Sequence, residues 1–243
     1  MKKAIVILSG GLDSSTCLYI AKDQGYDLYA VTFAYHQRHF IEIECAKKIA
    51  IAAGVKEHRI IELPTPKGTA LTENSNIKVP KGRNLEELSI EVPPTYVPAR
   101  NTLFIAYALQ YAEEVEAEVI FTGITAVDSS PYPDTRPEYI DAWQKLINKA
   151  TKQTVTGHSI RLETPLLHLY KSETIEIGMN LGVPYELTWS CYSPIYNSET
   201  EKDEYCLSCD TCTLRNKSFI EAGYRDPGVS EERWGEVVKN WNH

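Results

Sequence analysis

The stretch ILSGGLDSSTCL, residues 7–18, decides the fold class of this chain. An apolar run at 3–8 (KAIVIL) leads into two glycines, and residues 14–24 then carry apolar side chains at helical spacing. A strand, a glycine turn and a helix in this order aim the helix N-terminus at the turn. The unpaired N–H groups of that terminus and the positive end of the helix dipole attract anions. The stretch therefore predicts a phosphate-binding loop in the first β–α unit of an α/β domain.

The loop differs from the two common nucleotide-binding patterns. It lacks the lysine of G-x-x-x-x-G-K-[ST] and the spacing of G-x-G-x-x-G, so neither phosphoryl transfer nor hydride transfer is the expected chemistry. Gly10 and Gly11 permit a tight turn and a close approach of phosphate to the main chain. Further hydroxyl donors come from Ser9, Ser14, Ser15 and Thr16.

Strand-like and helix-like segments alternate after this loop. Further strands are expected at 28–33, 57–63 and 118–123, with a short one near 160–164, and further helices at 38–53 and 101–116. In the helix at 38–53, the residues that should share the buried face are Ile41, Cys45, Ile49 and Ala52. The alternation predicts a Rossmann-like α/β fold, a parallel sheet of about five strands with helices on both faces. We expect one domain at 1–185 and a C-terminal helical segment at 186–243, packed on it.

Two other regions bear on the architecture. The proline-rich segment 64–99 is long for a connection, and either a flap over a site or a plain surface connection would explain it. Trp234 and Trp241 are spaced for an amphipathic helix that packs on the core or on a second subunit.

The composition argues against some classes of protein. The 243 residues are 43% apolar and 24% charged, with a net charge of -8. An acidic chain is poorly suited to a long nucleic-acid footprint, because phosphate contacts need clustered Lys and Arg. No apolar run is long enough to span a bilayer, and the run at the N-terminus breaks too early for a signal peptide, so we expect a cytoplasmic protein.

Four of the six cysteines gather near the C-terminus, namely Cys191, Cys206, Cys209 and Cys212. Four thiolates match a closed tetrahedral zinc site, which would be structural. The C-x₂-C-x₂-C spacing also occurs in iron–sulfur proteins, so a cluster competes with zinc, and a redox disulfide is a third alternative. Cys17 and Cys45 are interpreted as small core residues.

The motifs together resemble a known family. Ser-Gly-Gly-x-Asp-Ser after a first strand resembles the pyrophosphate loop of the ATP pyrophosphatase superfamily. Within this superfamily, the chain resembles the 7-cyano-7-deazaguanine synthases over nearly its whole length. The motifs that carry the resemblance are YHQRH (35–39), VPARN (97–101), Asp-Ser-Ser-Pro-Tyr-Pro-Asp-Thr-Arg-Pro-Glu-Tyr-Ile (128–140), TPLLHLYKSETIEIGMNLGVP (164–184), TWSCY (188–192) and CLSCDTCTLR (206–215). The chain departs from the family pattern at Ser129, Pro131 and Thr135, where the family usually has Tyr, Gly and Cys. Proline fixes φ and lacks a donor, so this loop must have a different backbone.

The resemblance implies an activity and a set of site residues. It implies ATP-dependent conversion of 7-carboxy-7-deazaguanine and ammonia to a nitrile through an adenylated acid and an amide, with Mg²⁺ and a structural zinc. The implied ATP site runs over Leu8, Ser9, Gly10, Gly11, Leu12, Asp13, Ser14, Ser15, Thr16, Cys17 and Leu18, with Asp13 and Lys171 catalytic. The implied substrate contacts are Arg38, His39, Arg100, Asn101, Tyr132, Asp134 and Arg136. A homodimer is expected, and direct binding of nucleic acid is not.

Simpler interpretations stay open for several of these residues. Asp13 could hold Mg²⁺ or cap its helix, Asn101 could be only a cap, and Lys171 could be a solvated lysine at a helix start. Asp134 and Arg136 could form a surface ion pair, and Arg38 and His39 could lie in a solvated loop. For the whole chain, the alternatives are a tRNA-modifying sulfurtransferase with the same loop and a zinc-ribbon binding module without catalysis.

Overall fold

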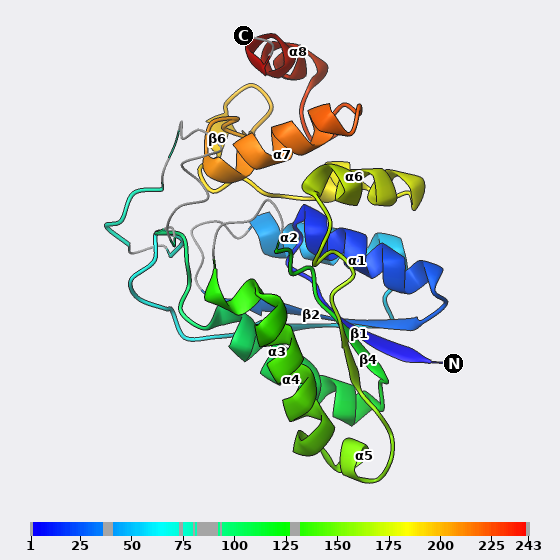
Figure 1. Ribbon diagram of the computed structural model, residues 1–243. Coiled ribbons are helices and arrows are strands. Elements are labelled where there is room, and N and C mark those ends of the chain that lie inside the picture. The colour runs from blue at the N-terminus through cyan, green and yellow to red at the C-terminus, as the bar shows by residue number, and fades with distance from the viewer. Residues whose placement is uncertain are drawn as a thin grey trace.

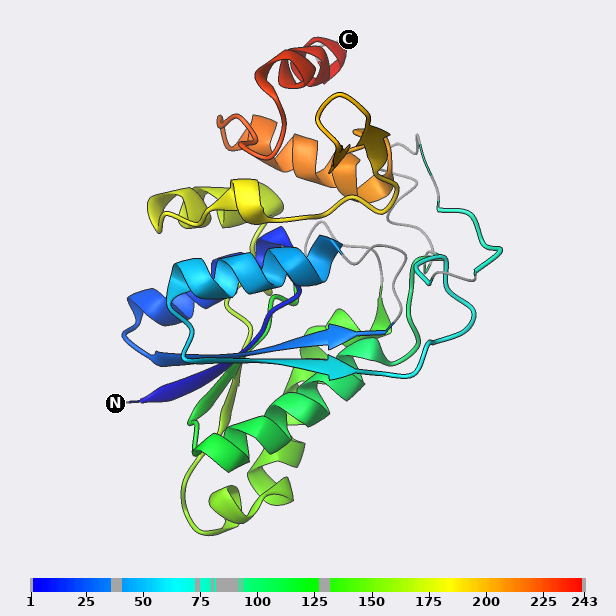
Figure 2. The same cartoon turned by 180° about the vertical axis from the view of Figure 1, so that it is seen from behind.

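A five-stranded parallel sheet organises the protein (Figures 1 and 2). The computed structural model describes residues 2–35, 41–72, 75–79, 81, 92, 94–126 and 132–241. The strands are β1 (Lys3–Ile7), β2 (Asp27–Ala34), β3 (Glu57–Glu62), β4 (Val119–Phe121) and β5 (Arg161–Glu163), in the order β3-β2-β1-β4-β5. Each neighbouring pair is parallel. The predicted Rossmann-like fold is confirmed.

Alternate residues of β1 face two different cores. Ala4 and Val6 pack into the core that contains α1 (Leu12–Asp23) and α2 (Ile41–Ala53). Ile5 and Ile7 pack into the opposite core, under α3 (Arg100–Val115) and α4 (Pro137–Ala150). A strand buried on both faces needs an apolar run without alternation, and KAIVIL is such a run. Figure 1 shows the two helix layers on either side of the sheet.

One detail of α2 differs from the sequence expectation. Ile43, Cys45 and Ile49 are buried, but Ala52 is exposed and Ala53 is buried in its place. From Ile49, the buried stripe continues to i+4 rather than i+3 in the last turn. The inner face of the helix is therefore rotated slightly relative to the predicted one.

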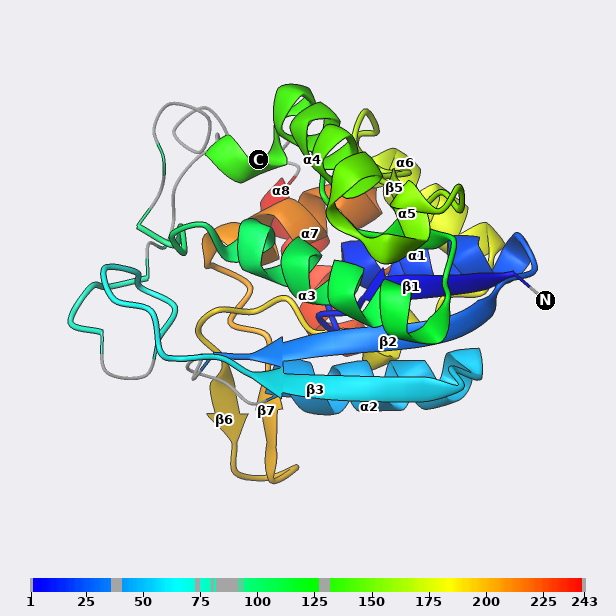
Figure 3. The same ribbon diagram turned by 90° about the horizontal axis from the view of Figure 1, so that it is seen from below.

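The C-terminal part packs on the outside of the α1 and α2 layer. Its helices are α6 (Lys171–Asn180), α7 (Asp210–Glu221) and α8 (Glu231–Trp241), and its small antiparallel hairpin consists of β6 (Ile195–Asn197) and β7 (Lys202–Glu204). Figures 1 and 3 show α6 beside α1, with α7 beyond it and the hairpin projecting from the body. The short helical segments are η2 (Pro133–Thr135), α5 (Lys152–Val155) and η3 (Tyr185–Leu187). The core beside α1 continues into this part without a break.

The expected amphipathic helix with the two tryptophans is α8. Trp234 is buried, with its ring centroid 6.5 Å from that of Phe219, whereas Trp241 in the last turn is 37% exposed. None of the helices in the described ranges combines the length and the apolar character that a membrane span requires.

Candidate active site and metal centre

A cleft of about 320 Å³ lies beyond the carboxyl ends of the central strands. β1 leads to α1 on one face of the sheet, and β4, its neighbour, is reached through α3 on the other face. Open α/β sheets bind ligands at such a switch point. The lining comes from the β1–α1 loop, the ends of β2 and β4, the first turns of α2 and α3, Lys171, and the C-terminal part between Trp189 and Arg215.

The two glycines of the loop have different roles. Gly10 has φ of +82°, and a Cβ there would lie 2.8 Å from the backbone nitrogen of Ala46, so only glycine fits against α2. Gly11 has φ of -84°, and a Cβ would lie 3.4 Å from Ser9 Oγ and 3.5 Å from the carbonyl oxygen of Trp189. Gly11 therefore faces space that the fold leaves open toward the cleft.

Serine hydroxyls tie the loop to the first turn of α1. Ser14 Oγ accepts a hydrogen bond from the Ser9 backbone N–H at 3.1 Å, and Ser15 Oγ donates to the Gly11 carbonyl at 2.7 Å. A Cβ on Gly123, after β4, would lie 2.8 Å from the Ser14 nitrogen, so β4 passes close to this turn. The N–H groups of the first turn have no intrahelical acceptor. The cleft thus receives a preformed set of anion-binding donors.

Lys171 lies at the start of α6 and reaches across to α1. Its Nζ lies 2.8 Å from Asp13 Oδ2 and 3.1 Å from Oδ1, and both side chains are partly buried. Gly11 holds the N-cap position of α1, and within the described residues the side chain of Asp13 hydrogen-bonds to Lys171. The structure therefore shows Asp13 paired with Lys171 rather than capping α1. The pair presents a cation next to the phosphate-binding turn.

A second polar group lies on another part of the cleft wall. Arg100 Nη1 donates to Tyr35 Oη at 3.2 Å, and the carboxylate of Glu42 faces the same space. Burial raises the pKa of Glu42 to about 7, although nearby Arg100 acts in the opposite direction. Burial also raises the pKa of Tyr35, so its hydroxyl stays neutral. This part of the wall therefore carries the guanidinium of Arg100 and the carboxyl group of Glu42, whose pKa depends on its surroundings.

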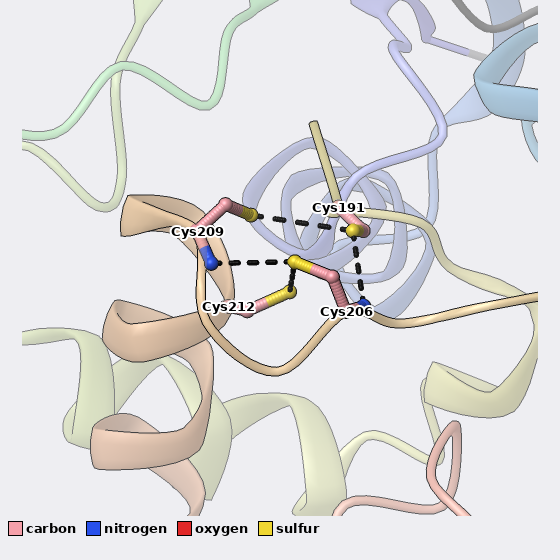
Figure 4. Close-up of side chains that lie close together, drawn as sticks. All are labelled: Cys191, Cys206, Cys209 and Cys212. Carbon is pink, nitrogen blue, oxygen red and sulfur yellow. Dashed lines mark hydrogen bonds between the residues drawn. The ribbon is translucent and has the colours of Figure 1, made fainter. Parts of the chain in front are cut away.

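The four C-terminal cysteines form one cluster. The Sγ atoms of Cys191, Cys206, Cys209 and Cys212 all lie within 4.8 Å of one another, and all four residues are buried (Figure 4). The sulfurs of Cys191 and Cys209 are 4.0 Å apart, and those of Cys206 and Cys212 are 3.9 Å apart. Four thiolates around one ion at about 2.3 Å would stand about 3.8 Å apart. The cluster fits a single tetrahedral ion, whereas a four-iron cluster, in which each thiolate binds its own iron, needs wider spacing.

Known proteins are similar to this chain over most of its length. The family described as "Queuosine biosynthesis protein QueC" matches residues 3–223. A curated 7-cyano-7-deazaguanine synthase from Syntrophus aciditrophicus is 50% identical over 233 residues, which are 95% of this chain and 98% of that protein. The enzyme of the same name from Trichodesmium erythraeum is 48% identical, over 93% of this chain and 99% of that protein. This chain belongs to the QueC family.

Solved structures are similar at a lower level. The NMN synthetase from Francisella tularensis is 16% identical with a TM-score of 0.46, and the match covers 99% of this chain and 83% of that chain. A 4-thiouridine synthetase in complex with RNA and ATP is 18% identical with a TM-score of 0.47, over 96% of this chain and 53% of that chain.

Only some of the site residues expected from the QueC resemblance line the cleft. Seven of the expected residues line the cleft: Leu8, Ser9, Gly11, Leu12, Asp13, Ser14 and Lys171. So do Arg100, Asn101 and Tyr132. Ser15, Thr16, Cys17 and Leu18 continue α1 into the core, where Thr16 Oγ1 lies 2.8 Å from Tyr185 Oη. Arg38 and His39 lie outside the described residues, as do Asp128, Ser129 and Pro131.

Asp134 and Arg136 are not on the cleft wall. The buried Asp134 accepts a 3.1 Å hydrogen bond from the Asn101 backbone N–H through Oδ2, and its carbonyl accepts one from Asn101 Nδ2 at 3.0 Å. Asp134 therefore holds the N-terminus of α3, and Asn101 holds η2 in return. Arg136 is exposed at the start of α4. Their predicted contact with substrate stays a prediction.

Sequence reasoning did not single out several cleft residues, among them Glu42, Trp189 and Arg215. Glu42 follows YHQRH by three positions, and Arg215 is the last letter of CLSCDTCTLR, so both stood beside recognised motifs. Trp189 lies in TWSCY, two residues before the predicted ligand Cys191. The spacing of these residues along the chain does not predict that they lie in the cleft, because the contacts that place them there join distant parts of the chain.

The remaining cysteines are not suited to sulfur transfer. Cys17 is completely buried, and burial raises its pKa well above the ordinary value. Burial likewise raises the pKa of Cys45 to about 11. A transferable sulfur needs a reactive, accessible thiolate. Neither residue provides one.

Proposed function

We propose that this chain is an ATP-dependent ligase that forms C–N bonds and converts 7-carboxy-7-deazaguanine and ammonia to 7-cyano-7-deazaguanine. The observation that carries the proposal is the 50% identity to a curated 7-cyano-7-deazaguanine synthase over 95% of the chain. A phosphate-binding loop, a lysine and an arginine in one cleft support it. The product would enter the biosynthesis of queuosine, for which the family is named.

The chemistry requires an activated oxygen. A carboxylate is a poor electrophile, because its leaving group would be oxide. Its oxygen attacks the α-phosphorus of ATP, which forms an acyl adenylate and releases pyrophosphate. Ammonia displaces AMP and gives the amide. The amide oxygen attacks a second ATP in the same way, and its departure with AMP leaves the nitrile.

In this scheme the protein positions groups and stabilises charge. The N–H groups at the start of α1 and the loop beside Gly11 hold the pyrophosphate. Lys171 neutralises charge that develops on the phosphates, and Asp13 orients the ammonium group of Lys171 and contributes to a Mg²⁺ site. Described parts of the segment 64–99, including Leu71 and Thr95, form cleft walls that keep water from the adenylate.

The four-cysteine cluster is proposed to hold one structural zinc. The thiolates fill a tetrahedral shell, so no position is left for a reacting water. The zinc would fix the C-terminal segment 186–243, as one packed unit, on the α/β domain at 1–185. We further propose a cytoplasmic homodimer that acts on the free base and does not bind nucleic acid.

A turnover assay tests the proposal. Purified protein with ATP, Mg²⁺ and ammonia should release AMP only when 7-carboxy-7-deazaguanine is present, and mass spectrometry should find the nitrile. Lys171→Met should lower kcat by about 100-fold or more, as expected for the loss of a charge that stabilises the transition state. Lys152→Met is the matched control, because Lys152 is an exposed lysine at another helix start. AMP release that does not depend on the acid would refute the assignment.

A further inference from the structure

Glu42 and Arg100 carry opposite charges on the same cleft wall without forming an ion pair. Both line the cleft, and no pair between them within 4.0 Å occurs among the described residues. Arg100 makes one side-chain hydrogen bond within the described residues, to Tyr35, although a guanidinium carries five N–H donors. Donors of Arg100 and acceptors of Glu42 are therefore both available to a molecule in the cleft.

The backbone of Glu42 lies against the loop that contains Gly10. Gly10 packs on the first turn of α2, where a Cβ would collide with the Glu42 carbonyl oxygen. Arg100 opens α3, whose N-terminus is held by Asp134. Two helix starts thus present the carboxylate and the guanidinium to the cleft. A site that discriminates between ligands needs such preorganised groups.

The surroundings of these two groups suit a flat ring. The cleft wall here contains Tyr35, Phe104, Tyr132 and Tyr192, and the rings of Phe33 and Phe104 stack with centroids 4.1 Å apart. Aromatic walls with a few placed polar groups are typical of sites for planar heterocycles. Burial raises the pKa of Glu42, and Arg100, the described cation that acts against this shift, does not offset it. A ligand that donates hydrogen bonds to Glu42 would compensate the negative charge of its carboxylate.

We propose that Glu42 determines the specificity of the cleft for a guanine-type ring, by accepting hydrogen bonds from the ring amide N–H and the exocyclic amine while Arg100 donates to the adjacent ring carbonyl oxygen. This inference rests on the proposed function and deepens it. The edge of a guanine-type ring presents one acceptor followed by two donors, and an arginine beside a glutamate presents the complement. A ring without the exocyclic amine would leave one carboxylate oxygen of Glu42 unpaired.

The test compares two substrates across three proteins. The substrates are 7-carboxy-7-deazaguanine and its analogue without the exocyclic amine, and the proteins are the wild type, Glu42→Gln and Glu44→Gln. Glu44 lies two residues on in the same helix but is exposed and pairs with Lys47, so it is the matched control. Glu42→Gln should lower kcat/KM for the amino substrate about 10- to 100-fold, as for a lost hydrogen bond to a charged group, and change the analogue little. KM for ATP should stay unchanged.

Two results would overturn the inference: an equal loss on both substrates, or no loss on either. Binding of 7-deazaguanine without ATP, followed by calorimetry, separates this inference from the proposed function. Weaker binding by Glu42→Gln than by Glu44→Gln supports the role of Glu42 even if the wild type does not turn over the acid, in which case the proposed reaction alone fails. A wild type that does not bind 7-deazaguanine, or binds it as well as Glu42→Gln does, contradicts the inference directly.

Discussion

The backbone N–H of Trp189 donates a 2.9 Å hydrogen bond to the carbonyl of Gly10. Its indole Nε1 donates to the carbonyl of Cys191 at 3.0 Å. One residue thereby joins the phosphate-binding loop to the cysteine cluster. Arg215 reinforces the same connection, since it donates to Thr188 Oγ1 at 2.8 Å and lines the cleft. The cluster is therefore placed to support the loop at Gly10 from behind.

Loss of the metal should consequently weaken ATP binding. Cys209→Ser removes one of four ligands, so we expect metal content to fall and the C-terminal segment to become less stable. Affinity for ATP should fall with it, because Trp189 no longer holds Gly10. Elemental analysis and calorimetry measure the two effects. Cys45→Ser, outside the cluster, should retain the metal. Iron with labile sulfide in the wild type would contradict the zinc assignment.

Gly11→Val should abolish ATP binding and leave the fold intact. At Gly11 an added Cβ meets only ordinary contacts, at 3.4 and 3.5 Å, but the branched side chain would fill the space of a phosphate. The loss of affinity should exceed tenfold, about 1.4 kcal/mol. Gly235→Ala is the control, because a Cβ there meets nothing within 4 Å. Circular dichroism verifies the fold, and unchanged ATP affinity in folded Gly11→Val would refute the role of the loop.

Removing only one partner of the Arg215–Asp226 pair should be strongly destabilising. The side chains are 2% and 0% exposed, and Arg215 Nη2 donates to Asp226 Oδ1 at 2.8 Å. Arg215→Met leaves a buried carboxylate without its cation, which costs about 3–5 kcal/mol. Urea denaturation measures this loss. The exposed pair of Arg161 and Glu163 provides the comparison, and Arg161→Met should cost no more than about 1 kcal/mol. Equal losses would show that burial does not govern the effect.

Stability should depend on pH through Glu42. Its pKa is raised from 4.5 to about 7 in the folded protein, so the folded state binds the proton more tightly than the unfolded state. The free energy of unfolding should therefore fall as the pH rises from 4.5 to about 7, by at most about 3 kcal/mol. Tyr35 stays neutral and Arg100 stays charged over this range, since the pKa of each lies above its ordinary value. Glu42→Gln should remove the slope, and parallel curves for the two proteins would contradict the assignment.

The sequence by itself determined the strands of the main sheet and the two chemical motifs, whereas α4 and the hairpin of β6 and β7 were not predicted. The β1–loop–α1 unit, the five strands and the four cysteines were predicted correctly, because each depends on short-range features. Apolar runs bury strands, helical spacing forms an inner face, and closely spaced thiols such as Cys206 and Cys209 come together in one cluster. The error at Ala52 arose where local spacing ended and packing of the last turn of α2 took over.

Only the tertiary structure decided which side chains face the cleft. Lys171 and Asp13 are 158 positions apart, and they meet because α6 packs beside α1. Glu42 and Arg100 share a wall because the order of the strands brings the starts of α2 and α3 to the same edge of the sheet. Asp134, whose contact with substrate stays a prediction, accepts a hydrogen bond from the distant Asn101. Such pairings depend on long-range packing, which the spacing of residues along the chain does not reveal.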